Sequence, residues 1–254
     1  AEGFLFSFTS PEKLIIRCHT PSFIAEDWNS LNPPYFSAFL KFLEKITLKR
    51  ARNITTPSKS LLRAIEKKIK IRPVVVQPYP IKTKAPFKKS YPNTYSEKRP
   101  LRILVAGRLE QRKGQDIVCR TFNILISKHF PVHLVFAGAD TPTRTGTFGA
   151  YLKSILSKEA RNRVDFLGHI NYKEIPVFYT KFDCYVMSSR FESLGFVVLE
   201  AMRAGLCIVA SNVCEMPRII QSCENGLLFQ FGNYKDLSSQ IEFLLKRPDE
   251  LERM

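Results

Sequence analysis

The stretch SSRFESLGFVVLEAMRAGLCIVASN, residues 188–212, decides the fold. A glycine turn leads into FVVLEAMRA, whose side chains are apolar almost all round, so we predict a buried helix. Glu200 lies in the middle of that helix, where a carboxylate needs either a charged partner or a ligand. The apolar runs FDCYVMSS and LCIVAS before and after it predict two strands, so the stretch indicates a strand–turn–helix–strand unit.

The turn before the helix predicts a site for an anion. A helix start leaves its first amides unpaired, and here these belong to Gly195, Phe196 and Val197, directly after Ser193 and Leu194. Glu192 falls on the loop and Glu200 about one turn inside the helix, so at ~1.5 Å per residue the two carboxylates flank the place where phosphate would bind. Hydroxyls at both ends and negative charge between them describe a nucleotide-sugar. The alternative is two ordinary salt bridges, from Glu200 to Arg203 and from Glu192 to Arg190.

A second motif, GRLEQRKGQD at residues 107–116, supplies positive charge. It follows the apolar run LRILVA and precedes the helical pattern DIVCRTFNILI, so we place it on a strand-to-helix turn. Open parallel sheets bind their ligands at such turns. Arg108 and Lys113 are its cations, and Gly107 and Gly114 let the backbone bend. Two cations facing an anion site are suited to clamp a diphosphate, although a solvated basic turn is the alternative.

Residues 101–246 alternate apolar strands with helical segments, which predicts an α/β fold with a parallel, doubly wound sheet. Residues 84–100 are rich in proline and lysine and lack periodicity, so we predict a linker there. The expected organisation is a partial first domain at 1–83, the linker at 84–100 and a second domain at 101–254. In the first part, KLIIRC, RNITTPS and VVVQPYP are expected strands, with a helix at about 36–50.

These motifs together resemble the family-4 glycosyltransferases, retaining enzymes of the GT-B fold that are also called group 1. GRLEQRKG is followed by FAGAD, FLGHI, the pair of glutamates with seven residues between them, and LEAMRAG, in the family's order over about residues 98–246. The resemblance implies two Rossmann-like domains, of which the second binds a nucleoside diphosphate sugar, with UDP-sugars favoured. It implies transfer of the sugar to a hydroxyl with retention of configuration, in polysaccharide or glycolipid synthesis. The acceptor, a saccharide or a lipid-linked molecule, would bind chiefly to the first domain.

The resemblance also assigns roles to residues. Arg108 and Lys113 would bind the diphosphate, Glu192 the hydroxyls of the donor sugar, and Glu200 the ribose. His19, at the end of an expected strand, would lie near the anomeric carbon and act in catalysis with Glu192, Arg108 and Lys113. The other residues expected to contact the donor are Gly107, Gly138, His169, Ser193, Leu194, Gly195, Phe196 and Val197.

The sequence departs from the family at two places. Where the family reads GG-x-PE, this chain has Cys214, Glu215, Met216, Pro217 and Arg218, which puts donor choice or activity in doubt. The part before the linker is too short for a complete first domain, and the chain begins with Ala1, so we expect a fragment. A non-catalytic partner protein with this fold, or a sugar-nucleotide epimerase, therefore remains an alternative.

Charge and cysteine usage bear on partners and location. Residues 1–100 carry 19 Lys and Arg against 7 Asp and Glu, a net of +12, whereas the remaining 154 residues carry a net of only +4. The basic helical patterns at 41–52 and 59–72 suit a solvated face or an anionic membrane surface; no nucleic-acid-reading motif accompanies them. The six cysteines lack metal-ligand spacing and indicate a reduced, cytoplasmic protein, at the inner face of a membrane if those patterns bind one. We expect no metal and no cofactor.

Overall fold

A computed structural model of the chain describes all residues except 1–6, 8, 10–13, 30–34, 79–90 and 93. By its internal contacts the chain divides into two compact units. The first unit comprises residues 1–82 and 191–194, and the second comprises residues 83–190 and 195–254.

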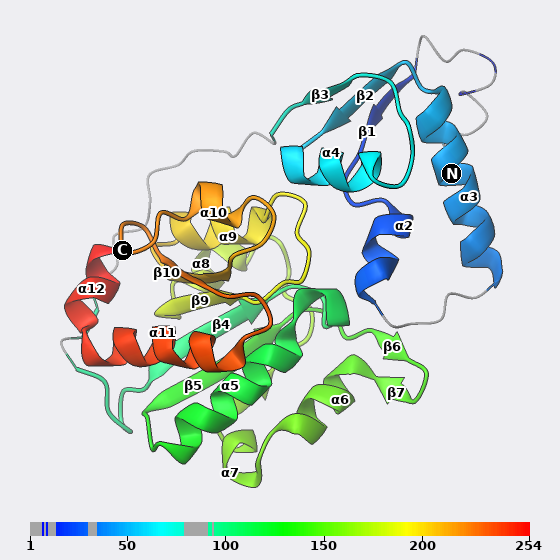
Figure 1. Cartoon of the computed structure of the whole chain (residues 1–254). Helices are drawn as coiled ribbons and strands as arrows, with labels where there is room; N and C mark the ends of the chain where they lie inside the picture. The colour runs from blue at the N-terminus through cyan, green and yellow to red at the C-terminus, as the bar shows by residue number, and fades with distance from the viewer. Residues whose placement is uncertain (1–6, 8, 10–13, 30–34, 79–90, 93) are drawn as a thin grey trace. The chain divides into compact units, whose positions relative to one another are not determined.

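The first unit contains a three-stranded parallel sheet in the order β1-β2-β3 (Figure 1). Its elements are β1 (Ile15–Arg17), α2 (Ser22–Ala25), the 3-10 turn η1 (Glu26–Trp28), α3 (Tyr35–Arg50), β2 (Asn53–Thr56), α4 (Lys59–Glu66) and β3 (Val74–Val76). Leu48 of α3, Ile54 of β2 and Leu61 of α4 are buried in its core. The three strands and the helix between the first two confirm the expectations for this region.

The second basic helix is shorter than predicted, because α4 ends at Glu66 and not near residue 72. The side chain of Ser58 caps its start by accepting a hydrogen bond from the Leu61 amide. Beyond its end, Pro73 biases the preceding backbone toward the extended conformation that β3 then continues. The spacing of apolar residues alone did not predict that the helix ends at Glu66.

The second unit is built on a six-stranded parallel sheet in the order β11-β10-β9-β4-β5-β8, which confirms the predicted fold class. Its strands are β4 (Leu101–Ala106), β5 (Val132–Ala137), β8 (Val164–Phe166), β9 (Cys184–Met187), β10 (Cys207–Ser211) and β11 (Leu227–Phe229). A small hairpin, β6 (Pro142–Thr143) with β7 (Gly146–Thr147), lies outside this sheet.

Successive residues of the strands other than β8 enter two separate cores, one on each face of the sheet. Ile103 of β4 belongs to the core formed with the helices of one face, whereas Leu104 belongs to the core of the other face. The first face carries α5 (Gln115–Ser127), α6 (Phe148–Ile155), α7 (Lys158–Arg161), α11 (Tyr234–Lys246) and α12 (Pro248–Arg253). The second face carries α8 (Ile175–Tyr179), α9 (Phe196–Arg203) and α10 (Met216–Ile219). In Figure 1, α5 and α11 run side by side over the first face.

The end of the predicted linker is packed on the second unit. Tyr91 and Tyr95 lie against the first core, and the Tyr91 hydroxyl donates a hydrogen bond to the Gly205 carbonyl. Arg99 donates two hydrogen bonds of 3.0 Å to the buried carboxylate of Asp183. Composition predicted a linker here, but the two tyrosines are partly buried against the sheet's first core. Residues 84–90 and 93 lie outside the described residues, and the predicted domain boundaries stay a prediction.

None of the helices in the described parts of the chain combines the length and the apolar composition that crossing a bilayer requires.

Candidate functional site

The candidate site lies where the strand order of the second unit reverses. From β4 the chain proceeds outward through β5 to β8, then returns to β9 beside β4 and proceeds outward again through β10 to β11. In such sheets the connections after the two central strands leave in opposite directions, so a crevice forms at their carboxyl ends. The motif at 107–116 follows β4, and the loop that leads to α9 follows β9.

The turn after β4 carries the two predicted cations, Arg108 and Lys113. Arg108 is exposed over 66% of its side chain, and its guanidinium lies 3.8 Å from the carboxylate of Glu110. Lys113 ends the 3-10 turn η2 (Gln111–Lys113). Its side chain folds back over Gly107: Nζ lies 3.9 Å from the position that a Cβ on Gly107 would occupy. The structure therefore brings Lys113 to the residue next to Arg108.

Two glycines permit backbone segments to meet at this edge. Gly138, at the end of β5, has φ +153, and a Cβ there would lie 2.0 Å from the Gly107 carbonyl oxygen. Its amide donates a hydrogen bond of 2.7 Å to the Gly168 carbonyl, so the ends of β4, β5 and β8 are linked. Gly114 has φ +67, and a Cβ there would lie 2.0 Å from the Ser188 carbonyl oxygen. His169, next to Gly168, is exposed.

Helix α9 begins as the sequence predicts. Gly195 adopts the left-handed conformation, with φ 79, and forms the N-cap of a helix that starts at Phe196. Val198 makes the first helical hydrogen bond, 2.9 Å to the Gly195 carbonyl, so the amides of Gly195, Phe196 and Val197 precede the helical ladder. The predicted burial all round is wrong, because Val198 and Ala201 are the fully buried positions and the remaining residues are half-buried. One side of the helix therefore faces the surface.

Glu200 lies one turn inside α9, half-buried, beside a small cavity of about 90 Å³ between α8 and α9. Burial raises the pKa of its carboxyl above the usual range, while a hydrogen bond from Tyr179 and the positive charge of Arg203 oppose that shift. Burial in turn raises the pKa of the Tyr179 phenol, which keeps it a donor. The alternative of a simple Glu200–Arg203 salt bridge is thus replaced by a hydrogen bond from Tyr179.

The second alternative, a salt bridge between Arg190 and Glu192, is wrong for Arg190. Both oxygens of Asp116 accept hydrogen bonds of 2.8 Å from its guanidinium. Asp116 was not predicted from the sequence, although it lies in the first turn of α5, where the helix dipole favours an acidic side chain. Glu192, Ser193 and Leu194 group with the first unit, where Leu194 is buried.

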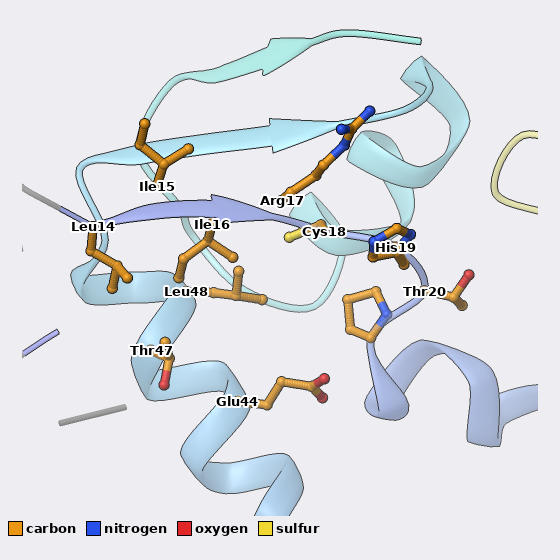
Figure 2. A pocket seen from close by; sticks show the side chains of 11 residues that line it. Leu14, Ile15, Ile16, Arg17, Cys18, His19, Thr20, Glu44, Thr47 and Leu48 are labelled. Carbon is orange, nitrogen blue, oxygen red and sulfur yellow. The ribbon is translucent and has the colours of Figure 1, made fainter. Parts of the chain in front are cut away.

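His19 belongs to the first unit and lies just beyond the carboxyl end of β1. It lines a cavity of about 440 Å³ together with residues 14–21 and three residues of α3. Figure 2 shows Glu44 of α3 directed toward this strand end. The Glu44 carboxylate accepts hydrogen bonds of 2.9 Å from the Ser22 amide and 2.7 Å from its hydroxyl. Burial, with a smaller contribution from the charge of Glu44, raises the pKa of the Cys18 thiol to about 11, so this cysteine stays protonated at neutral pH.

The segment from Cys214 to Arg218, which departs from the family motif, has an unusual backbone conformation at its first residue. Cys214 adopts φ 53, a left-handed conformation that favours glycine and strains other residues. Glu215 is buried at 8% exposure, and Arg218 lies 3.7 Å from its carboxylate. The loop thus keeps a backbone suited to the missing glycine. Within the described residues, no group of acidic, histidine or cysteine side chains is arranged to hold a metal ion.

The comparison with known families bears directly on this arrangement. A family model described as Glycosyl transferases group 1 matches residues 88–254, which include the whole six-stranded sheet. The chain belongs to this family. The part that matches contains the turn after β4 and helix α9, while residues 1–87 fall outside the match.

Curated relatives share the same region. The chain is 33% identical over 156 residues to spore coat protein SA of Bacillus subtilis, covering 60% of this chain and 41% of that protein. It is 28% identical over 156 residues to alpha-D-kanosaminyltransferase of Streptomyces kanamyceticus, covering 61% of this chain and 39% of that protein. The chain thus spans less than half of the length of either relative.

Solved structures show the same fold. HepE from Anabaena, solved in complex with UDP and glucose, has a TM-score of 0.74 at 18% identity, covering 99% of this chain and 67% of that one. The C-terminal domain of a glycosyl transferase group 1 family protein from Francisella tularensis has a TM-score of 0.55 at 25% identity, covering 62% of this chain and 82% of that one. The predicted GT-B type fold is confirmed.

We predict that Gly114→Ala destabilises the second unit by about 3 kcal/mol, because it combines an unfavourable φ with a clash against the Ser188 carbonyl. Gly232→Ala is the matched control: its φ is +78, yet no atom lies within 4 Å of the added methyl group. Only the conformational strain, about 1 kcal/mol, should remain there. Urea unfolding of both variants measures the difference, and equal losses would contradict the close approach at Gly114.

Proposed function

We propose that this chain carries the donor site of an enzyme that transfers a sugar from a nucleoside diphosphate sugar to an acceptor hydroxyl, with retention of configuration. One observation carries the proposal: at the reversal of strand order, Arg108 and Lys113 after β4 share an edge with the amino end of α9 after β9. Two cations and a helix start at one crevice suit a diphosphate. UDP is the favoured nucleotide, since HepE was solved with UDP.

The roles proposed for the residues follow from their chemistry. Arg108, Lys113 and the amides that start α9 would stabilise the negative charge that grows on the departing diphosphate. Because these groups already supply positive charge, we expect the reaction to need no metal ion. Glu200 would accept hydrogen bonds from the ribose hydroxyls. The leaving phosphate would take the acceptor's proton on the same face of the sugar, which accounts for retention.

Three assignments rest on the family resemblance: Glu192 with the hydroxyls of the donor sugar, and His19 and His169 near the donor. The cavity beside His19 in the first unit is the proposed acceptor site, since it offers about 440 Å³ at the end of β1. The acceptor would be a saccharide or a lipid-linked molecule.

A non-catalytic partner protein is the second candidate, and the buried Glu215 in the place of a family glycine favours it. A transfer assay on the full-length protein, with labelled nucleotide-sugar and chromatographic detection of product, separates the two candidates. Nucleotide binding without turnover would identify the non-catalytic form.

We predict that a nucleoside diphosphate stabilises the second unit of the chain. Ligand at a hundred times its dissociation constant adds ~2.7 kcal/mol to the free energy of unfolding, because it binds the folded state alone. Thermal melting with UDP, GDP and ADP at millimolar concentration measures the shift. If none of the three raises the melting temperature, the proposed donor site is wrong.

Substitutions of the two glutamates should differ in which ligand they weaken. Glu200→Gln is expected to weaken UDP and UDP-sugar alike, because a neutral amide is a weaker acceptor for the ribose hydroxyls. Glu192→Gln should leave the dissociation constant of UDP within about twofold and impair sugar recognition. Isothermal titration with UDP and a UDP-sugar checks both, and the assignment fails if Glu192→Gln weakens UDP as much as Glu200→Gln does.

Glu200→Gln should at the same time raise the melting temperature of the ligand-free protein at pH 7. A carboxyl whose pKa is raised by folding stabilises the folded state at low pH, and that contribution is lost as pH rises through the raised pKa. The neutral amide removes this dependence, so the gain should vanish near pH 4.

An anionic membrane surface is a further proposed partner, which would place the enzyme at the inner face of a membrane in the cytoplasm. Helix α3 carries Phe39 at 52% exposure and Phe42 at 58%, with Lys49 and Arg50 exposed at its end. Exposed aromatic rings beside basic residues are typical of helices that lie on bilayers. The basic residues of α4, Lys59 and Arg63, are exposed as well.

We predict that the chain sediments with vesicles containing phosphatidylglycerol, and that raising salt from 0.15 to 1 M weakens the binding, because the screening length falls from ~8 to ~3 Å. The double change Phe39→Ser and Phe42→Ser should reduce the bound fraction severalfold. Val177→Ser, which removes another large exposed apolar residue (62%) from the second unit, should not. Equal sedimentation with neutral and anionic vesicles would show that the basic residues of these helices form a solvated face and do not bind the membrane.

A further inference from the structure

We infer that Asp116 and Arg190 form a positioning pair that holds the two sides of the donor site in register. The inference rests on the proposed function, since it assigns a purpose to residues that the donor itself does not contact. The two sides, both in the second unit, are the turn of residues 107–114 after β4 and the residues 188–190 and 195–197, which follow β9 and begin α9. They are far apart in sequence and neighbouring in the sheet.

The pair is a bidentate ion pair inside the second unit. Nη1 of Arg190 lies 2.8 Å from Oδ1 of Asp116, and Nη2 lies 2.8 Å from Oδ2. The two side chains are only 19% and 12% exposed. A planar guanidinium that binds both oxygens of a carboxylate fixes orientation as well as distance, which a lysine does not.

The same two sides are tied at further points. The amide of Arg190 donates a hydrogen bond of 2.8 Å to the Arg112 carbonyl, and its Nη1 also bonds to the Gln111 carbonyl. The Ser188 hydroxyl donates a hydrogen bond of 2.9 Å to the Lys113 carbonyl. Gly114 lies so close to the Ser188 carbonyl that no side chain fits between them. The guanidinium of Arg190 therefore forms its hydrogen bonds within the protein. We assign Arg190 as a positioning residue and not as a ligand of the diphosphate.

The positions of Asp116 and Arg190 in the sequence indicate which groups this pair would position. Asp116 lies three residues after Lys113, and Arg190 lies five residues before Gly195 at the start of α9. If the pair is lost, only the backbone and Ser188 contacts remain to fix the separation of the cations from the helix amides. Displacements of about 1 Å at a reacting or binding group reduce function by as much as 10²-fold.

The chain contains a natural control. Arg99 and Asp183 form the same kind of pair, with two hydrogen bonds of 3.0 Å and a carboxylate at 1% exposure. The Asp183 carboxylate also accepts from the Arg102 amide, near the amino end of β4, so this pair lies at the opposite edge of the sheet. Loss of either pair costs stability, whereas only the Asp116–Arg190 pair adjoins the donor site.

The experiment compares Arg190→Gln and Asp116→Asn with Arg99→Gln in the whole chain, well below their melting temperatures. Isothermal titration with UDP should show a dissociation constant about tenfold higher for the first two variants and within twofold for Arg99→Gln. The exchanged pair, Asp116→Arg with Arg190→Asp, should recover part of the affinity. The inference is overturned if all three single variants weaken UDP equally, or if the first two leave it unchanged.

Hydrogen exchange of the ligand-free proteins makes the test independent of the proposed function. Arg190→Gln should speed the exchange of amides in 107–114, 188–190 and 195–197, while Arg99→Gln should speed exchange near residues 99–102 and 183. If the wild type binds no nucleotide, the proposed function fails, and this exchange pattern alone decides the positioning pair. An unchanged pattern in Arg190→Gln overturns it.

Discussion

The candidate site depends on backbone segments approaching one another more closely than any side chain permits. At the carboxyl edge of the large sheet, Gly138 meets the Gly107 carbonyl and Gly114 meets the Ser188 carbonyl. These contacts bring the turn after β4 against the neighbouring strand ends. Arg108, Lys113 and Arg190 are positioned relative to them. Arg108 and Lys113 leave from the turn, and Arg190 and α9 leave from the segment opposite.

The strands could be predicted from the sequence because both faces of a parallel sheet are covered. Runs such as LRILVAG and VHLVFAG are apolar throughout, and they become β4 and β5 with alternate residues in two cores. The start of α9 was predictable for a related reason: only glycine readily adopts the left-handed conformation seen at Gly195.

Side-chain partners were harder to predict, because they depend on which segments meet in three dimensions. Arg190 has Glu192 as a neighbour in sequence, yet the fold brings Asp116 to it from a helix more than seventy residues earlier. The docked end of the predicted linker has the same origin. Proline and lysine dominate the composition of this segment. Tyr91 and Tyr95 nevertheless pack against the first core, a contact that the local sequence pattern does not predict. The role of His19 is left to the family resemblance for that reason.

In the proposed donor site, the half-buried position of Glu200 would couple nucleotide binding to protonation. A carboxyl whose pKa is raised by burial holds its proton at a higher pH than in water, whereas hydroxyl donors from a ribose favour the charged carboxylate. If Glu200 binds the ribose as proposed, nucleotide and proton would compete for its carboxylate, and binding would release whatever fraction of a proton the free protein still held. Affinity should fall on mild acidification, and the heat of binding should depend on the ionisation enthalpy of the buffer. A single buried carboxylate would thereby connect occupancy of the donor site to the acidity of its surroundings.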